Sequence, residues 1–229
     1  MRINKYISET GYCSRRETDR LIMAGRITVN GLVCMKDTLV ECDDDILIDG
    51  NPIPSKKEHV YLMLNKPAGI TCTAAKHVEG NIIDFVHFPA RIFPVGRLDK
   101  DSVGLILLTN DGDIVNKIMH SGNMHEKEYI VTVDHPITDA FIEKMSVGVE
   151  ILGTVTKRCD VQKVNEFVFR IILTQGLNRQ IRRMCKELGY KVEKLERVRI
   201  MNILLDELER GQWRNLTEEE LKVLFLLLS

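Results

Sequence analysis

A continuous apolar segment at residues 103–108 lies near the middle of the chain, and Asn-Asp-Gly turn residues follow it closely. Short apolar runs between turn signals are typical of strands that are buried on both faces. Residues 61–65 show the same pattern, and residues 149–164 and 166–174 also favour strands. Residues 126–133 alternate apolar and polar positions, as half-buried strands do. We therefore expect a sheet with residues 103–108 in its interior.

Apolar residues with helical spacing occur between and beside these strands. The expected helices cover residues 2–9, 14–24, 113–119, 136–148, 178–189 and 221–228. Ser14 and Glu17 have the spacing of a capping box at the start of the second helix, and Pro136 lies near the first turn of the fourth. Asn178 is the expected N-cap of the fifth helix, and Gly189 is expected to end it. The pattern as a whole predicts an α+β protein.

The first fifty residues are expected to form a separate small module. Asn30-Gly31 between alternating apolar residues is a strong hairpin signal, so this module combines two helices with a hairpin. Residues 51–59 contain two prolines and no apolar period, which is typical of a linker. We therefore predict a domain at residues 1–50, a linker at 51–59 and a larger domain at 60–229.

Composition is that of an ordinary globular protein, with 44% hydrophobic and 28% charged residues among 229, enough for one large and one small domain. The six cysteines form no Cys-x-x-Cys pair, and the first residues do not resemble a signal peptide. We expect reduced thiols and a cytoplasmic location. The apolar stretch at residues 221–228 is too short to span a bilayer, so no membrane partner is expected.

Charge is unevenly distributed although the net charge is only −1. Residues 1–26 have six basic side chains against three acidic ones, and residues 170–199 have nine against three. Residues 27–50 have one basic side chain against six acidic ones. Solvated helix faces would explain any single charge run. Two basic surfaces separated by an acidic one also suit a nucleic-acid partner.

The polar segment at residues 96–102 directly precedes the apolar strand at 103–108. A loop at a strand end is held rigidly, so the carboxylate of Asp99 is a candidate nucleophile or base. Arg97 lies two residues earlier, and in an extended segment both side chains would leave the same face. From spacing alone, a surface turn with charges in water explains the pattern equally well.

The motif Gly-Arg-Leu-Asp-Lys-Asp-Ser-x-Gly-Leu, which contains Asp99, resembles the active-site motif of the RsuA/RluF-type pseudouridine synthases. Three further stretches resemble motifs of the same family: the Lys-Pro-x-Gly that begins at Lys66, the Lys-Glu-Tyr that ends at Tyr129, and the Asn-Arg-Gln-Ile-Arg-Arg-Met that contains Arg182. Gln175 stands where much of the wider family has glutamate, and its surroundings look like the RluF branch. The resemblance spans nearly the whole chain.

The N-terminal module has a resemblance of its own. Ser-Arg-Arg-Glu at residues 14–17, followed by Gly-Arg-Ile-x-Val-Asn-Gly at 25–31, resembles the alpha-L RNA-binding domain that is shared with a small-subunit ribosomal protein. This resemblance implies that basic helix faces grip phosphates with little reading of bases. The candidate phosphate ligands are Lys5, Arg15, Arg16 and Arg26.

The family resemblance implies a small alpha-L domain followed by a mixed, mainly antiparallel catalytic sheet. It also implies isomerisation of uridine to pseudouridine in ribosomal RNA, and the RluF branch favours the large subunit. The uridine would be flipped out into a pocket, where Asp99 starts cleavage of the C1′–N1 bond, Tyr129 stacks on uracil and Arg182 pairs with Asp99. The other residues expected to contact RNA are Arg97, Lys66, Asn178, Arg179 and Arg183.

No cofactor and no metal are expected, because the isomerisation conserves all atoms and the chain has no nucleotide-binding glycine loop. The expected partner is ribosomal RNA or a ribosome assembly intermediate, bound by a monomer. Three alternatives remain open at this point: a small-subunit target, a non-catalytic assembly factor, and a metal-dependent RNA-processing enzyme. In the last, magnesium would be bound by carboxylates, as in nucleases. Its candidate ligands are Asp99, Asp101, Asp111 and Asp113.

Overall fold

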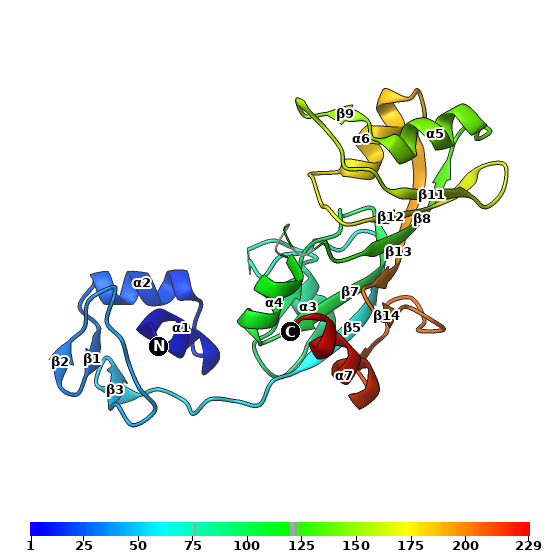
Figure 1. The fold of residues 1–229 in the computed structure, drawn as a ribbon. Helices are drawn as coiled ribbons and strands as arrows, with labels where there is room; N and C mark the ends of the chain where they lie inside the picture. The colour runs from blue at the N-terminus through cyan, green and yellow to red at the C-terminus, as the bar shows by residue number, and fades with distance from the viewer. Residues whose placement is uncertain (76, 120–121, 123) are drawn as a thin grey trace. The chain divides into compact units, whose positions relative to one another are not determined.

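The computed structural model describes residues 1–75, 77–119, 122 and 124–229 (Figure 1). It divides into two compact units. The first comprises residues 1–60, 89–91 and 110–112, and the second comprises residues 61–88, 92–109 and 113–229. Each unit has hydrophobic core residues of its own. Within the ranges described, no helix is long and apolar enough to cross a membrane.

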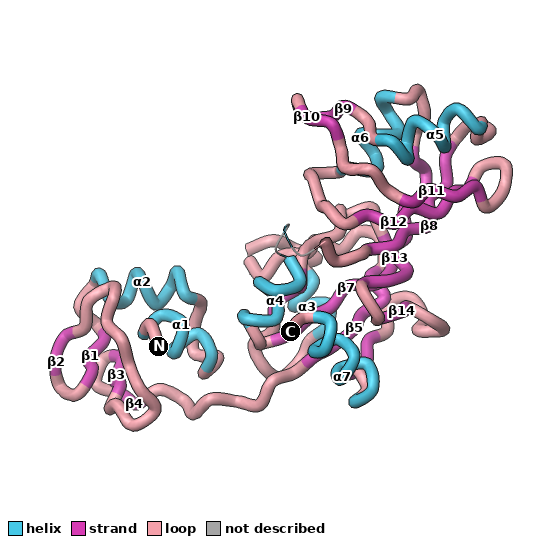
Figure 2. The backbone as a smooth tube through the Cα atoms, in the orientation of Figure 1, coloured by secondary structure: helices cyan, strands magenta, loops and turns pink. Residues whose placement is uncertain are grey.

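The first unit contains two helices and a small antiparallel sheet (Figure 2). Its elements are α1 (Ile3–Glu9), α2 (Arg15–Met23), β1 (Ile27–Val29), β2 (Leu32–Val33), β3 (Ile46–Ile48) and β4 (Asn51–Pro52), with the strand order β2-β1-β3-β4. Asn30 and Gly31 have positive φ angles of 51° and 80° and connect β1 to β2, so the predicted hairpin is confirmed. The predicted linker is shorter than expected, because its first two residues pair with β3 as β4.

The start of α2 shows half of the predicted capping box. The Ser14 hydroxyl accepts a hydrogen bond from the Glu17 backbone N–H at 3.1 Å. The Glu17 carboxylate instead accepts one from Arg20 at 2.9 Å. The helix therefore begins where the sequence indicates, but an ion pair along the helix has taken the place of the second capping bond.

The second unit contains the other elements. Its described strands are β5 (Tyr61–Lys66), β6 (Phe93–Val95), β7 (Val103–Thr109), β8 (Lys127–Val133), β9 (Glu150–Ile151), β10 (Thr154–Val155), β11 (Asp160–Lys163), β12 (Val168–Leu173), β13 (Val192–Ile200), β14 (Ile203–Leu204) and β15 (Trp213–Asn215). Its described helices are α3 (Ile82–Val86), α4 (Gly112–Met119), α5 (Asp139–Val147), α6 (Gln180–Glu187) and α7 (Glu218–Leu227).

The main sheet has the strand order β11-β12-β8-β13-β7-β5-β15 in the described part of the chain. The β7–β13 pair is parallel and the other pairs are antiparallel, so the predicted mixed, mainly antiparallel sheet is confirmed. Every residue of β7 is buried, as its apolar sequence predicts. β7 lies inside the sheet between β13 and β5 and therefore provides a rigid end for the loop that precedes it.

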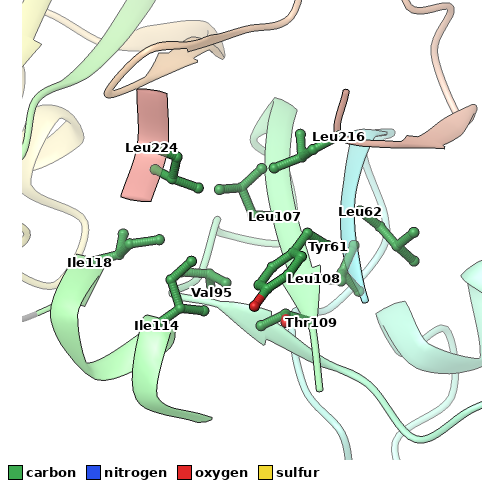
Figure 3. A pocket seen from close by; sticks show the side chains of 10 residues that line it. All are labelled: Tyr61, Leu62, Val95, Leu107, Leu108, Thr109, Ile114, Ile118, Leu216 and Leu224. Carbon is green, nitrogen blue, oxygen red and sulfur yellow. The ribbon is translucent and has the colours of Figure 1, made fainter. Parts of the chain in front are cut away.

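Helices pack against this sheet in two groups (Figure 1). α5 and α6 share a core with β8, β11, β12 and β13, whereas α4 and α7 share a second core with β5 and β7. Around Leu107 in the second core, apolar side chains leave a cavity of only about 10 Å³ (Figure 3). That volume holds at most about one water molecule, so this core is a packed interior and not a ligand site.

Three element predictions for this unit need correction. The helix predicted at residues 136–148 begins only at Asp139, where the Thr138 hydroxyl caps the Phe141 N–H at 3.1 Å, so Pro136 lies outside it. The strand predicted at 149–164 is divided into the β9–β10 hairpin and β11. The long strand β13 was not predicted, because its register shifts interrupt the alternation of buried and exposed positions.

Candidate active site

The loop that carries Asp99 joins β6 to β7 and is anchored on both sides. Leu98 is buried, and the Ser102 backbone N–H donates to the Asp99 carbonyl oxygen at 3.1 Å. The Gly69 N–H donates to the carbonyl oxygen of Lys100 at 2.8 Å. The Asp99 side chain itself stays 26% exposed. The loop therefore holds its backbone rigidly and presents one carboxylate.

Lys66 supports this loop from within the protein. Its side chain is fully buried at the end of β5, and its ammonium donates to the carbonyl oxygens of Pro67 at 2.8 Å and Lys100 at 3.2 Å. Burial lowers the pKa of the Lys66 ammonium. The structure gives no support to the prediction that Lys66 contacts RNA, because its ammonium is enclosed and bonded to the backbone beside Asp99.

Two arginines of the α6 segment flank Asp99. The Asp99 Oδ2 atom lies 3.4 Å from Arg179 Nη1 and 3.6 Å from Arg182 Nε. Charge-assisted hydrogen bonds are shorter, at about 2.7–2.9 Å. The arginines therefore attract and orient the carboxylate without saturating its lone pairs, which leaves an acceptor open to a substrate.

Arg182 is itself fixed by other contacts. Its guanidinium donates to the Val192 carbonyl oxygen at 3.2 Å and to the Ser102 hydroxyl at 3.3 Å. Its Nε is buried and has no hydrogen-bond partner among the described residues. The structure thus brings Arg182 and Asp99 together, and the same side chain joins α6, the start of β13 and the Asp99 loop.

Asn178 does not cap α6, so this prediction is wrong. The N-cap is Arg179, in the left-handed conformation with φ 52° and without a side-chain capping bond. Asn178 instead accepts hydrogen bonds from Arg183 at its carbonyl oxygen, 3.0 Å, and its side-chain oxygen, 3.2 Å. Arg183 is therefore turned back on the loop before the helix, and Asn178 and Arg179 are exposed.

Asp99 opens onto a cleft of about 600 Å³ in the second unit. The volume lies in the range of pockets that enclose small molecules, so a flipped-out nucleotide base would fit. The cleft brings together residues from six separate segments of the chain. Its lining includes Arg97, Lys127, Tyr129, Gln175, Arg179 and Arg197. Arg97 is exposed at this cleft.

Tyr129 and Lys127 reach the cleft from β8, where side chains two residues apart share a face. Tyr129 is half-buried and packs against the core that includes α6, which holds its ring in place. Burial, together with the charge of Arg197, lowers the pKa of Lys127. Sequence analysis missed Lys127, although the period of two before Tyr129 would have indicated it.

Three arginines of the basic stretch at residues 170–199 are engaged or buried and so do not add to the predicted basic surface. Arg170 and Arg199 donate to Glu128 at 2.6 Å and 2.8 Å, and Arg197 is buried. Charge counted along the chain misled here, because strand pairing brought a glutamate from β8 between two of the arginines. Sequence analysis also missed Arg197 as a cleft residue.

The predicted phosphate ligands of the first unit differ in how they are engaged. Arg15 and Arg16 are exposed on α2. Lys5 lies 3.7 Å from a glutamate one turn along α1, and the Arg26 Nε donates to Asp49 at 2.8 Å. Arg15 and Arg16 are therefore better placed than Lys5 and Arg26 to meet an external phosphate.

The four aspartates of the metal alternative gain no support from the structure. Across residues 1–75, 77–119, 122 and 124–229, no three His, Cys, Asp or Glu side chains gather where they could share a metal ion. Asp101, next but one to Asp99, is exposed.

Comparisons with known proteins identify the family. The model of the RNA pseudouridylate synthase family matches residues 60–187, and the model of the S4 domain matches residues 1–46. The chain belongs to the RNA pseudouridine synthase family. It is 56% identical to the dual-specificity RNA pseudouridine synthase RluF of Escherichia coli K12, over 100% of this chain and 80% of that one. The enzyme class that the Asp99 motif predicted is therefore confirmed.

Two further relatives of this pseudouridine synthase cover both chains almost completely. The ribosomal small subunit pseudouridine synthase A of Yersinia pestis is 31% identical, over 96% of this chain and 97% of that one. A crystal structure of a pseudouridylate synthase superposes with a TM-score of 0.72 and 29% identity, covering 98% and 99% of the two chains. An S4 domain followed by a synthase domain is the predicted architecture, which is thereby confirmed.

Proposed function

We propose that this pseudouridine synthase modifies ribosomal RNA, that its target is a uridine of the large subunit, and that Asp99 is the catalytic carboxylate. The observation that carries the proposal is the placement of Asp99, partly exposed between Arg179 and Arg182, on a cleft that also contains Tyr129. The RluF-like sequence around Gln175 supports the large subunit, and the identity of 56% to RluF, against 31% to a small-subunit enzyme, supports placement in that branch.

The chemistry would proceed on a uridine that has left the base stack and entered the cleft. The Asp99 carboxylate attacks C1′ or removes a sugar proton, and in either case the electrons of the C1′–N1 bond leave with the base. The base turns, and C5 forms a bond to C1′ as the Asp99–C1′ bond breaks. On the proton-removal route, Asp99 instead returns the proton to the sugar. The C5 proton is then lost and N1 gains one, so all atoms balance without a co-reactant. Tyr129 holds the ring by stacking during the turn.

The neighbours of Asp99 would have distinct tasks in this reaction. Arg182 orients the carboxylate while fixed to Ser102, and Arg179 adds a second positive charge on the exposed side. Arg97 is exposed at the cleft and would occupy the gap that the flipped nucleotide leaves. Every cleft residue belongs to one compact unit of one chain, which supports action as a monomer.

We assign RNA capture to the S4 domain through exposed arginines of α2. Replacing both Arg15 and Arg16 by glutamine should reduce RNA affinity and flatten its salt dependence by about 1.4–1.8 in the slope of log affinity against log salt. Arg26→Gln is the matched control, since Asp49 already neutralises that arginine. An unchanged slope in the double variant would mean that these two arginines do not contact RNA phosphates.

The target is tested by mapping pseudouridines in all RNA classes from cells with and without the gene. We expect one or more large-subunit positions to lose the modification. Loss in small-subunit RNA alone would overturn the subunit assignment, and no loss in any class would favour a non-catalytic assembly factor. The purified enzyme should also act on the mapped RNA after exhaustive chelation. Activity that returns only with magnesium, in RNA that stays folded, would support the metal-dependent alternative.

A further inference from the structure

Arg197 is a buried cation without a role in the reaction proposed for Asp99. It lies on β13, is only 2% exposed, and lines the cleft. Its Nε donates to the Leu105 carbonyl oxygen at 2.7 Å. Its Nη2 is buried and has no hydrogen-bond partner in the part of the chain that the structure describes. An open N–H on a buried charged group is costly, so a partner from outside the chain is expected there.

The position of Arg197 is set by its neighbours in the sheet. It pairs in register with Tyr129 on β8, so the two side chains lie beside each other on the same face. On the other side it pairs with Gly104 of β7, where an added Cβ would lie 2.3 Å from the Arg197 carbonyl oxygen. Gly104 also has φ +97°, which disfavours other residues. This glycine lets β13 approach closely enough for Arg197 to reach Leu105.

A register shift decides which face Arg197 occupies. The pairing of β13 with β8 shifts between Arg197 and Arg199, so Arg197 pairs with Tyr129 and Arg199 with Glu128. Without the shift, two residues that are two apart in a strand would share a face. The irregularity therefore sends Arg199 to Glu128 and leaves Arg197 on the face of the cleft.

We propose that Arg197 binds the uracil ring through Nη2 and stabilises the negative charge that the detached base carries. This inference rests on the proposed reaction in the Asp99 cleft. When the C1′–N1 bond breaks, the electron pair on N1 is delocalised onto the exocyclic oxygens O2 and O4. A donor that is held beside the stacking Tyr129 is in position before this charge develops, and preorganised donors are most effective in that situation. Lys127 adds a second cation on the same cleft.

The first test compares Arg197→Met with Arg199→Met in single-turnover reactions. The rate with Arg197→Met should fall by about 10²-fold, as when one preorganised donor is removed, while RNA affinity stays at the wild-type level. Arg197→Lys keeps the charge and should lose less. Arg199→Met, on the same strand but bonded to Glu128, should keep the wild-type rate at a temperature where it is folded. A wild-type rate in Arg197→Met would overturn the proposal.

The second test separates contact with the base from a structural role. RNA with 2-thiouridine or 4-thiouridine at the target has a weaker acceptor at one exocyclic position. Wild-type enzyme should be slowed by one of the two, and Arg197→Met should not be slowed further by it. If one analogue slows both enzymes by the same factor, Arg197 does not contact the base. If neither analogue slows the wild-type enzyme, the contact is also contradicted, and this result does not depend on the variant. Failure of the proposed function would be seen in a different measurement, namely pseudouridine formation by the Asp99→Asn variant.

Discussion

Two carboxylates of the synthase domain, Asp99 and Glu128, each lie between two arginines, but the spacing differs. Around Asp99 the nitrogen–oxygen distances are 3.4 Å and 3.6 Å, whereas around Glu128 they are 2.6 Å and 2.8 Å. Glu128 is adjacent in β8 to Tyr129, which lines the cleft, so its own side chain leaves the opposite face of the strand. The same combination of residue types is thus used once in the cleft and once outside it.

The difference separates the carboxylate that we propose is reactive from a structural one. Burial alone would raise the pKa of Glu128, but hydrogen bonds from Arg170 and Arg199 outweigh it and lower that pKa. Both oxygens of Glu128 are engaged, one by each arginine. Asp99 has charge compensation without short bonds, so its lone pairs remain available for attack or proton removal. A carboxylate that is positioned but not saturated is what the proposed chemistry needs.

The largest effect is expected for Asp99→Asn. The amide has nearly the same shape but can neither attack the sugar nor accept its proton, so turnover should fall on the order of 10⁴-fold or more. The thermal midpoint should change little, because the ion pairs around Asp99 are long. RNA binding should persist or tighten, since a negative charge has been removed. Pseudouridine formation and RNA affinity are measured on one preparation, with the exposed Asp101→Asn as control. Equal losses in both variants would contradict the assignment.

The surroundings of Asp99 and Glu128 can be compared further by replacing one arginine beside each carboxylate with lysine. In Arg182→Lys a single ammonium cannot contact Val192, Ser102 and Asp99 together, so turnover should fall by about 10²-fold through loss of orientation. The matched change Arg170→Lys should leave the turnover of folded enzyme unchanged. Single-turnover rates at saturating enzyme decide between these outcomes, and equal rates in the two variants would mean that Arg182 does not orient the carboxylate.

Glu128→Gln should show the reverse pattern, with an effect on stability and not on chemistry. Two arginines lose their shared anion in a largely buried place, at a cost of about 2 kcal/mol. The thermal transition of the synthase domain should move to lower temperature, and the rate per folded molecule should be retained. Calorimetry and single-turnover assays on the same sample give both quantities. A loss of rate at full folding would mean that the far side of β8 contributes to catalysis.

The smallest effect is the pH dependence of that stability difference. The folded-state pKa of Glu128 is lowered below its ordinary value of 4.5, so its contribution is fully present above that pH and is lost as pH falls through the folded-state pKa. The gap in thermal midpoint between wild-type enzyme and Glu128→Gln should therefore be constant near neutrality and close below about pH 4.5. A gap that persists at lower pH would assign the stabilisation to shape and not to charge.

Sequence reasoning located the loop that carries Asp99 because its signals are local. An apolar run between turn residues predicted the buried strand β7, and the motif before it identified Asp99 and the family. A helix start that depends on neighbouring residues was also predicted at Ser14, whose hydroxyl accepts a hydrogen bond from the Glu17 N–H at the start of α2. Asn178 shows the limit of this approach, because a side chain that suits an N-cap instead accepts hydrogen bonds from Arg183.

By itself, therefore, the sequence determined the α+β class, the S4 and synthase domains, and the loop that carries Asp99, because these depend on neighbours along the chain. Tertiary structure alone decided how the charged residues are used. Lys66 belongs to a recognisable motif, yet only packing shows that it is enclosed and bonded to the loop backbone. Arg197 and Arg199 are indistinguishable by sequence spacing. The physical reason for their different positions is a register shift between paired strands, which places one guanidinium in the cleft and the other on Glu128.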